Sequence, residues 1–190
     1  ETESFKPKRL TTDARGNVDR NTVSVYNDII REYQRKKKMY VRLQSDYKKT
    51  QRIDPTKLSR KDVEKDYSFV KKTIDELIYY RDELVANIEN LKSLLPDNPP
   101  VTKPVVQSGG RDDPVSLPKF IQSVKIQIED MESKVRNIDR YVTELERKQK
   151  KISDEHNIGK GEKSRRQINI ERLISDLNSI KDYKDDRFAR

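Results

Sequence analysis

Four tyrosines follow one another at intervals of seven residues in the first quarter of this 190-residue chain: Tyr26, Tyr33, Tyr40 and Tyr47. On an α-helix this spacing returns a side chain to nearly the same face every two turns, so the four rings form one stripe. Exposed rings of this kind can stack on nucleic-acid bases or anchor another protein, whereas buried rings form a seam between helices. The sequence predicts the stripe and leaves both interpretations open.

The same stretch is strongly basic. Residues 31–52 hold nine Lys/Arg against two acidic residues, a net charge of +7. Such an excess can neutralise phosphates with release of counterions, or it can form an ordinary solvated surface. The tyrosine stripe together with its neighbouring cations is therefore the candidate docking site for a partner or for nucleic acid. The cations of this site are Arg31, Arg35, Lys37, Lys38, Arg42 and Lys48.

The sequence contains few of the residue types that commonly perform catalysis. The sequence contains no cysteine and a single histidine, His156. These residues cannot make an ordinary zinc site or a Cys/His or Ser/His/Asp catalytic set. We therefore expect a protein that is not an enzyme, with no catalytic residues, no cofactor, no metal site and no small-molecule substrate. His156 is expected to play a structural role at a helix end.

Apolar residues at alternating spacings of three and four predict the elements that carry these residues. The pattern occurs in four segments, and no useful length alternates with period two. The expected fold class is all-α, with four long helices. The first begins near residues 19–21 and ends before Pro55, and the second begins at Ser59. The third begins at Ser116 and stops near His156, where glycines follow, and the fourth comes after that break.

The breaks suggest a division into four parts: a flexible basic N-terminal arm (1–18), a helical hairpin (19–95), a Pro/Gly-rich linker (96–117) and a second hairpin (118–190). Each hairpin is expected to be an antiparallel coiled coil, although a bent continuous helix in 118–190 would leave its two segments unpaired. The linker is long enough to run back along a whole helix. The second and third helices can therefore be parallel or antiparallel.

Two polar residues interrupt otherwise apolar seams, namely Arg81 in the second helix and Gln149 in the third. Single polar residues at such positions can fix the register between helices. Alternatively, the stem of Arg81 packs while its guanidinium reaches solvent. Arg81 and Gln149 are thus candidate register-determining residues, with the solvent-directed interpretation of Arg81 left open.

Composition favours interaction through narrow helical seams over a wide core, because 39% of residues are charged and only 32% hydrophobic. No apolar run approaches the roughly 20 residues that cross a bilayer, and the first residues lack the apolar core of a signal peptide. The lack of cysteine is compatible with a reducing environment. We expect no membrane span and a location inside the cell or within a particle assembled in the cytoplasm.

These observations predict a non-enzymatic coiled-coil structural or scaffolding subunit of a larger macromolecular assembly, such as a viral particle or another multi-subunit complex. Its partners would be other protein subunits, in an oligomer or a hetero-complex, and it would dock through the first helix and the basic arm. The alternative is a nucleic-acid-binding module that uses the Tyr/Lys/Arg stripe of the first helix.

Overall fold

A computed structural model of the protein describes residues 10, 12–96, 115–158 and 168–178. The regular structure in these ranges is helical apart from two isolated bridges, which confirms the expected all-α class. A further helical segment spans residues 168–178 and is called here the tail helix. The four main helices are α1 (Arg20–Arg35), α2 (Lys37–Thr50), α3 (Val63–Ser93) and α4 (Leu117–His156).

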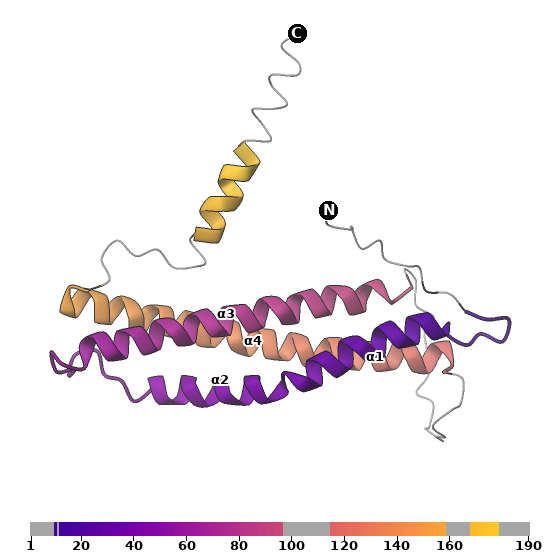
Figure 1. The fold of residues 1–190 in the computed structure, drawn as a ribbon, viewed down its shortest axis with the longest axis horizontal. Helices are drawn as coiled ribbons and strands as arrows, with labels where there is room; N and C mark the ends of the chain where they lie inside the picture. The colour runs from indigo at the N-terminus through magenta and orange to yellow at the C-terminus, as the bar shows by residue number, and fades with distance from the viewer. Residues whose placement is uncertain (1–9, 11, 97–114, 159–167, 179–190) are drawn as a thin grey trace, which may run out of the picture.

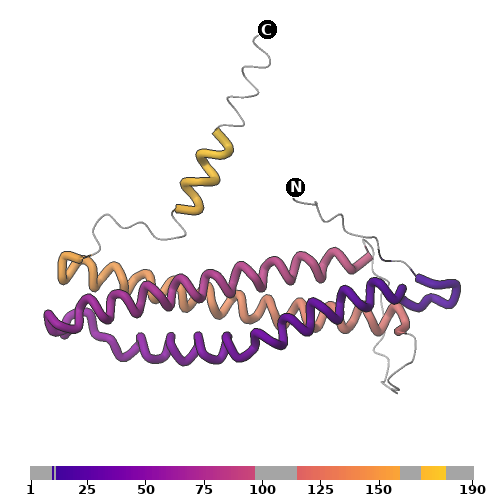
Figure 2. Tube along the Cα trace, in the orientation of Figure 1, coloured from indigo at the N-terminus to yellow at the C-terminus, as the bar shows by residue number. Residues whose placement is uncertain are grey.

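The four main helices form an elongated bundle of three layers, because α1 and α2 run end to end with a break at Lys36 (Figure 1). The chain runs along α1–α2, turns, returns along α3 and then runs along α4 in the original direction (Figure 2). Ion pairs support this path: Arg42 meets Glu76 at 2.8 Å and Lys36 meets Glu83 at 2.7 Å. As residue numbers increase along α1–α2, the numbers of their partners on α3 decrease, as an antiparallel pair requires.

The core lies along the seam between α3 and α4. Leu77, Leu84 and Leu91 of α3 are fully buried, and so are Ile138 and Leu145 of α4. Each such side chain stabilises the fold by about 1.5–3 kcal/mol relative to an exposed one. The seven-residue spacing of the three leucines is the heptad pattern of the sequence, now seen as one continuous buried row.

The relative direction of α3 and α4, which the sequence left open, is antiparallel. Arg81 lies 2.5 Å from Asp139, and Lys92 lies 3.5 Å from Glu132. The predicted pairing of residues 118–156 with the segment after them is not found among the described residues. Instead, α4 packs on α3 and on α1–α2, so one bundle replaces the expected pair of separate hairpins.

The tail helix stands away from the bundle in Figure 1. Its aliphatic residues are about half exposed or more, whereas the prediction had buried them in the second hairpin. This outcome follows from the geometry of α4, whose seam is already covered by α3 and α1–α2. The exposed fractions are 50% for Ile168, 49% for Ile170, 61% for Leu173, 52% for Ile174 and 65% for Leu177.

Part of the predicted flexible arm has a defined structure. The Asp13 side chain accepts hydrogen bonds from the backbone of Arg15 and Asn17, and Gly16 adopts the left-handed conformation that glycine permits. The Val18 amide donates to the Val115 carbonyl, so residues 12–18 are attached to the start of α4. The rest of the arm (1–9 and 11) and most of the predicted linker (97–114) lie outside the described residues.

Two helix boundaries test the capping predictions. The third predicted helix ends at His156, with Asn157 in a left-handed conformation, as the break after it predicts. The second begins at Val63 instead of Ser59, because Ser59 and Asp62 bond to each other at 2.5 Å in a preceding turn. The helices are therefore placed by the sequence to within a few residues.

A matched pair of leucine substitutions tests which helices form the core. We expect Leu84→Ala to lower the free energy of unfolding by about 2–5 kcal/mol, because a fully buried side chain leaves a cavity. Leu177→Ala in the exposed tail helix should change it by less than about 0.5 kcal/mol. Urea denaturation followed by circular dichroism measures both values, and equal losses would contradict the three-layer core.

Candidate interaction surface: the tyrosine ladder and the basic face of α1–α2

The tyrosine stripe faces α4, where it meets polar side chains with the same seven-residue spacing. In each of three contacts the residue number on α4 exceeds that of the tyrosine by 97. A constant offset is possible only because α1–α2 and α4 run parallel, so the three contacts form successive rungs of one ladder. Two phenols donate hydrogen bonds to carboxylates, and the third accepts one from an amide at 3.4 Å. The rungs are Tyr33 with Asp130, Tyr40 with Asn137 and Tyr47 with Glu144.

Aromatic contacts extend the ladder at both ends. The ring of Tyr26 meets Phe120 edge-on, with centroids 5.4 Å apart. At the other end, the ring of Tyr47 stacks on Tyr141 at 4.0 Å. Such pairs add about 0.5–1.5 kcal/mol beyond the area they bury. The stripe thus attaches α1–α2 to α4 over its whole length.

The Tyr33 rung carries the strongest polar cluster of the ladder. Lys134 donates a hydrogen bond to Asp130 at 2.8 Å and another to the Tyr33 hydroxyl, and its ammonium lies 5.1 Å from the Tyr33 ring centroid. Burial pushes the pKa of Asp130 upward, but hydrogen bonds from Lys134 and Tyr33 lower it overall. The stabilisation from this carboxylate is therefore present above its unfolded pKa of about 3.9 and is lost as pH falls through the lower folded value.

The position of the rings decides between the two interpretations of the stripe in this conformation. Tyr33 is 5% exposed and Tyr40 is 7% exposed, while Tyr26 and Tyr47 are half-buried against the core. A base or a partner could not stack on Tyr33 or Tyr40 unless α1–α2 separated from α4. The buried-seam interpretation therefore describes the ladder, and the exposed residues of the candidate docking site are its six cations.

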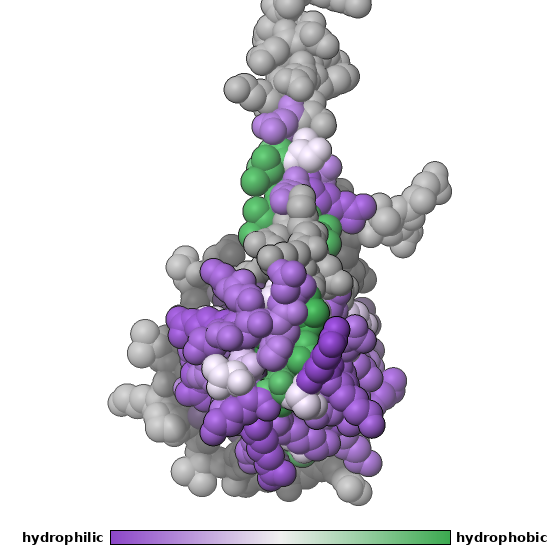
Figure 3. Space-filling view, turned by 90° about the vertical axis from the view of Figure 1, so that its left-hand side faces the viewer, coloured by the Kyte–Doolittle hydropathy of each residue, from purple (hydrophilic) through white to green (hydrophobic). Residues whose placement is uncertain are grey.

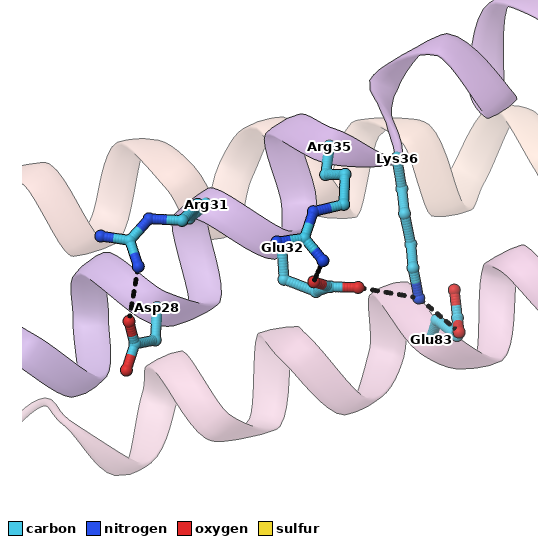
Figure 4. Close-up of polar contacts among 6 residues, drawn as sticks. All are labelled: Asp28, Arg31, Glu32, Arg35, Lys36 and Glu83. Carbon is cyan, nitrogen blue, oxygen red and sulfur yellow. Dashed lines mark hydrogen bonds and ion pairs between the residues drawn. The ribbon is translucent and has the colours of Figure 1, made fainter.

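Three of the six candidate cations already have acidic neighbours. Figure 4 shows Arg31 and Arg35 directed toward carboxylates on their own helix, Asp28 and Glu32, each at 3.2 Å. Arg42 pairs across to α3 at 2.8 Å. Exposed pairs of this kind contribute about 0–1 kcal/mol and leave the cations accessible. The remaining three have no ion pair within the described part of the chain and are exposed: Lys37, Lys38 and Lys48.

The break between α1 and α2 holds an interaction that the sequence analysis did not identify. Lys36 reaches across to Glu83 of α3 at 2.7 Å and also lies 3.4 Å from Glu32 (Figure 4). The hydrogen bond to Glu83 is the main cause of the raised pKa of Lys36. Only the antiparallel register of α1–α2 and α3 brings these residues together, so no local sequence signal reveals the pair.

The candidate register residues are not counterparts of each other. Arg81 bonds to Asp139 of α4, whereas Gln149 lies ten residues further along that helix, about 15 Å away. The Arg81 side chain is one-third exposed, so a cross-helix pair is combined with partial access to solvent. Whether Arg81 fixes the register is a prediction that a substitution would test.

The end of the bundle where α2 turns into α3 is fastened by α4. Lys148 donates to the Thr50 carbonyl at 2.6 Å, which satisfies a free carbonyl at the end of α2, and a ring nitrogen of His156 lies 2.8 Å from the Pro55 carbonyl. Burial lowers the pKa of Lys148. Figure 3 looks onto this end and shows hydrophilic side chains around a narrow apolar stripe.

A surface hollow of about 250 Å³ opens between the end of α2, the following loop and α4. It is called here the basic hollow, because three cations on one face of α4 contribute to its wall together with one carboxylate, that of Glu144. This carboxylate already accepts a hydrogen bond from the Tyr47 hydroxyl. The lining residues are Gln51, Pro55, Glu144, Arg147, Lys148 and Lys151.

The described ranges lack two further features. They contain no group of three or more His, Cys, Asp or Glu side chains arranged to hold a metal ion. None of the helices described there is both long and apolar enough to cross a membrane. Comparisons with protein-family models, curated proteins and solved structures find no match to this chain.

The buried ladder predicts loss of stability at alkaline pH. Burial is the main reason that the pKa rises for Tyr33 and Tyr40, and it raises the pKa of Tyr47 to about 12. It also raises to about 12 the pKa of Tyr80 of α3, whose ring centroid lies 5.9 Å from that of Tyr40. A raised folded pKa means that the stabilisation is complete below the unfolded value of about 10 and disappears as pH rises through the folded value. The urea midpoint should therefore fall between about pH 10 and pH 12.

Tyrosine-to-phenylalanine variants check the origin of this alkaline loss. Tyr33→Phe should flatten the decline, because a phenyl ring cannot ionise. The matched control is Tyr79→Phe, since the Tyr79 ring is 49% exposed and lies outside the ladder. An identical alkaline decline in both variants would show that the ladder does not cause it.

Proposed function

We propose that this protein is a non-enzymatic helical structural subunit of a larger macromolecular assembly. The three-layer bundle acts as a rigid spacer, and docking elements on its surface recruit other subunits. The observation that carries the proposal is the tail helix, which holds four aliphatic side chains on one face without cover from the bundle. The predicted docking site on the first helix is revised accordingly, because its rings are used inside the chain.

The spacing in the tail helix supports a packing role. Ile170, Leu173, Ile174 and Leu177 follow an i, i+3, i+4, i+7 pattern, which makes an apolar stripe about 100° wide. Most helical stability in proteins comes from the packing of an amphipathic face, so a helix with an uncovered apolar stripe would be stabilised by a partner. A stripe of this width fits a groove formed between two or more elements of a partner, as in other amphipathic helices that bind protein grooves.

Nucleic-acid binding remains the second candidate, favoured by the three lysines that face solvent without ion pairs in the described ranges. Lys37, Lys38 and Lys48 lie on α2, within the most basic third of the sequence. Lysines of this kind can contact phosphates without base recognition. The buried tyrosines would then contribute stability, and no stacking, to this function.

One capture experiment tests both candidates. Immobilised full-length protein is exposed to an extract of its source, with and without nuclease, and compared with Leu173→Asp/Leu177→Asp and with Lys37→Glu/Lys38→Glu/Lys48→Glu. We expect a defined set of proteins that survives nuclease, persists with the lysine variant and is lost with the leucine variant. Retention of nucleic acid that only the lysine variant abolishes would support the second candidate. If the wild-type protein retains nothing beyond what both variants retain, neither function holds.

A further inference from the structure

The basic hollow combines an apolar wall with a positive rim. Pro55 and the hydrocarbon stems of the long side chains supply the wall. Arg147, Lys148 and Lys151 supply three positive charges from two neighbouring turns of α4. Because Glu144 is the single acidic residue that lines the hollow and is already bonded to Tyr47, the rim has a net positive charge. A complementary ligand would present an aliphatic group next to carboxylates.

The tail helix has this composition. With about 100° of rotation per residue, Glu171 and Asp176 fall on opposite borders of its apolar stripe. The cation Arg172 falls on the far side of the helix from the stripe. Leucine and isoleucine side chains are thus flanked by two carboxylates, and this arrangement matches the wall and the rim of the basic hollow.

We propose that the tail helix of one molecule docks in the basic hollow of a second copy of this chain. This inference rests on the proposed function and names its partner. Leu173 and Leu177 enter the apolar part of the hollow, while Glu171 and Asp176 approach Arg147 and Lys151. Lys148 stays engaged with the end of α2.

Charge disfavours the other surface that the tail helix could use, the α3–α4 face of its own bundle. Asn169, near the start of the tail helix, already lines a small hollow on that face with Asp82 and Asp139. Glu132 lies seven residues before Asp139, about two turns away on the same side of α4. All three carboxylates are paired with cations of α3. Arg81 is the one cation that lines this hollow and it already pairs with both Asp82 and Asp139, so the face offers no net positive charge to Glu171 and Asp176. The acidic borders of the tail helix therefore fit the basic hollow better than this face.

A contact between two different surfaces is heterologous, so each molecule keeps one free tail helix and one free hollow. Such contacts produce rings when the rotation closes and open chains when it does not. A structural subunit that extends by adding copies of itself follows from this geometry. Tail-to-tail pairing, by contrast, would stop at a dimer.

The test measures the mass of full-length protein in solution by light scattering over a range of concentrations. The wild type should increase in mass beyond a dimer as concentration rises. The tail variant Leu173→Asp/Leu177→Asp and the hollow variant Arg147→Glu/Lys151→Glu should each remain monomeric. An equimolar mixture of the two should form dimers and nothing larger, because one variant keeps the hollow and the other keeps the tail helix.

Matched controls separate docking from general charge and polarity effects. Ile168→Asp alters the tail helix opposite its stripe, and Lys37→Glu/Lys38→Glu changes the same charge as the hollow variant at a distant site; both should assemble like the wild type. Reversal at both sites, Glu171→Lys/Asp176→Lys with Arg147→Glu/Lys151→Glu, should restore assembly that either half abolishes. Circular dichroism confirms that each variant is folded.

Three results would overturn the inference. The first is a wild type that stays monomeric at every concentration, which includes the case of a tail helix folded on its own bundle. The second is a hollow variant that still forms dimers, as tail-to-tail pairing predicts. The third is a mixture of the two variants that stays monomeric. The proposed function would still hold if the tail helix captured other proteins from nuclease-treated extract. Failure of the docking between copies can therefore be distinguished from failure of the proposed function.

Discussion

The structure depends on the parallel contact between α1–α2 and α4. Three tyrosine hydroxyls meet three polar residues of α4 at a constant offset of 97 residues, and ring packing continues the contact beyond them. Residues spaced by seven on α1–α2 can contact residues spaced by seven on α4 in one register, in which all three contacts form at the same time. This contact holds the third layer on the α3–α4 pair and removes the rings from the surface.

The sequence was sufficient for the helices but not for their arrangement. Heptads and capping signals predicted the end of α4 at His156, and the fully buried row of Leu77, Leu84 and Leu91 follows the predicted seam. Two alternatives that the sequence left open depend on contacts between residues far apart in the chain. The direction of α4 relative to α3 depends on pairs such as Arg81–Asp139, 58 residues apart, and the burial of Tyr33 on its contact with Asp130, 97 residues apart. The Lys36–Glu83 pair was missed for the same reason, since either residue alone resembles an ordinary surface charge.

The tail helix shows why a strong periodic pattern does not by itself identify a partner. Leu173 and Leu177 belong to a seam as regular as that of α3, yet they are more than half exposed. The bundle has already covered its own seams, so this stripe is available to another molecule. The three-layer spacer and the uncovered stripe together support the proposed role as a structural subunit, in which the basic hollow is the proposed complementary surface on the next copy.

The most direct measurement of the central contact is a double-mutant cycle for Tyr33→Phe and Asp130→Asn in urea denaturation. The ladder predicts a coupling free energy of at least about 1 kcal/mol between the two substitutions. Each single substitution breaks the same hydrogen bond to a charged group, so the double mutant loses less than the sum of the two single losses. The control cycle of Tyr33→Phe with Glu144→Gln, two rungs away, should be additive within about 0.5 kcal/mol. Additivity in both cycles would contradict the parallel register of α1–α2 and α4.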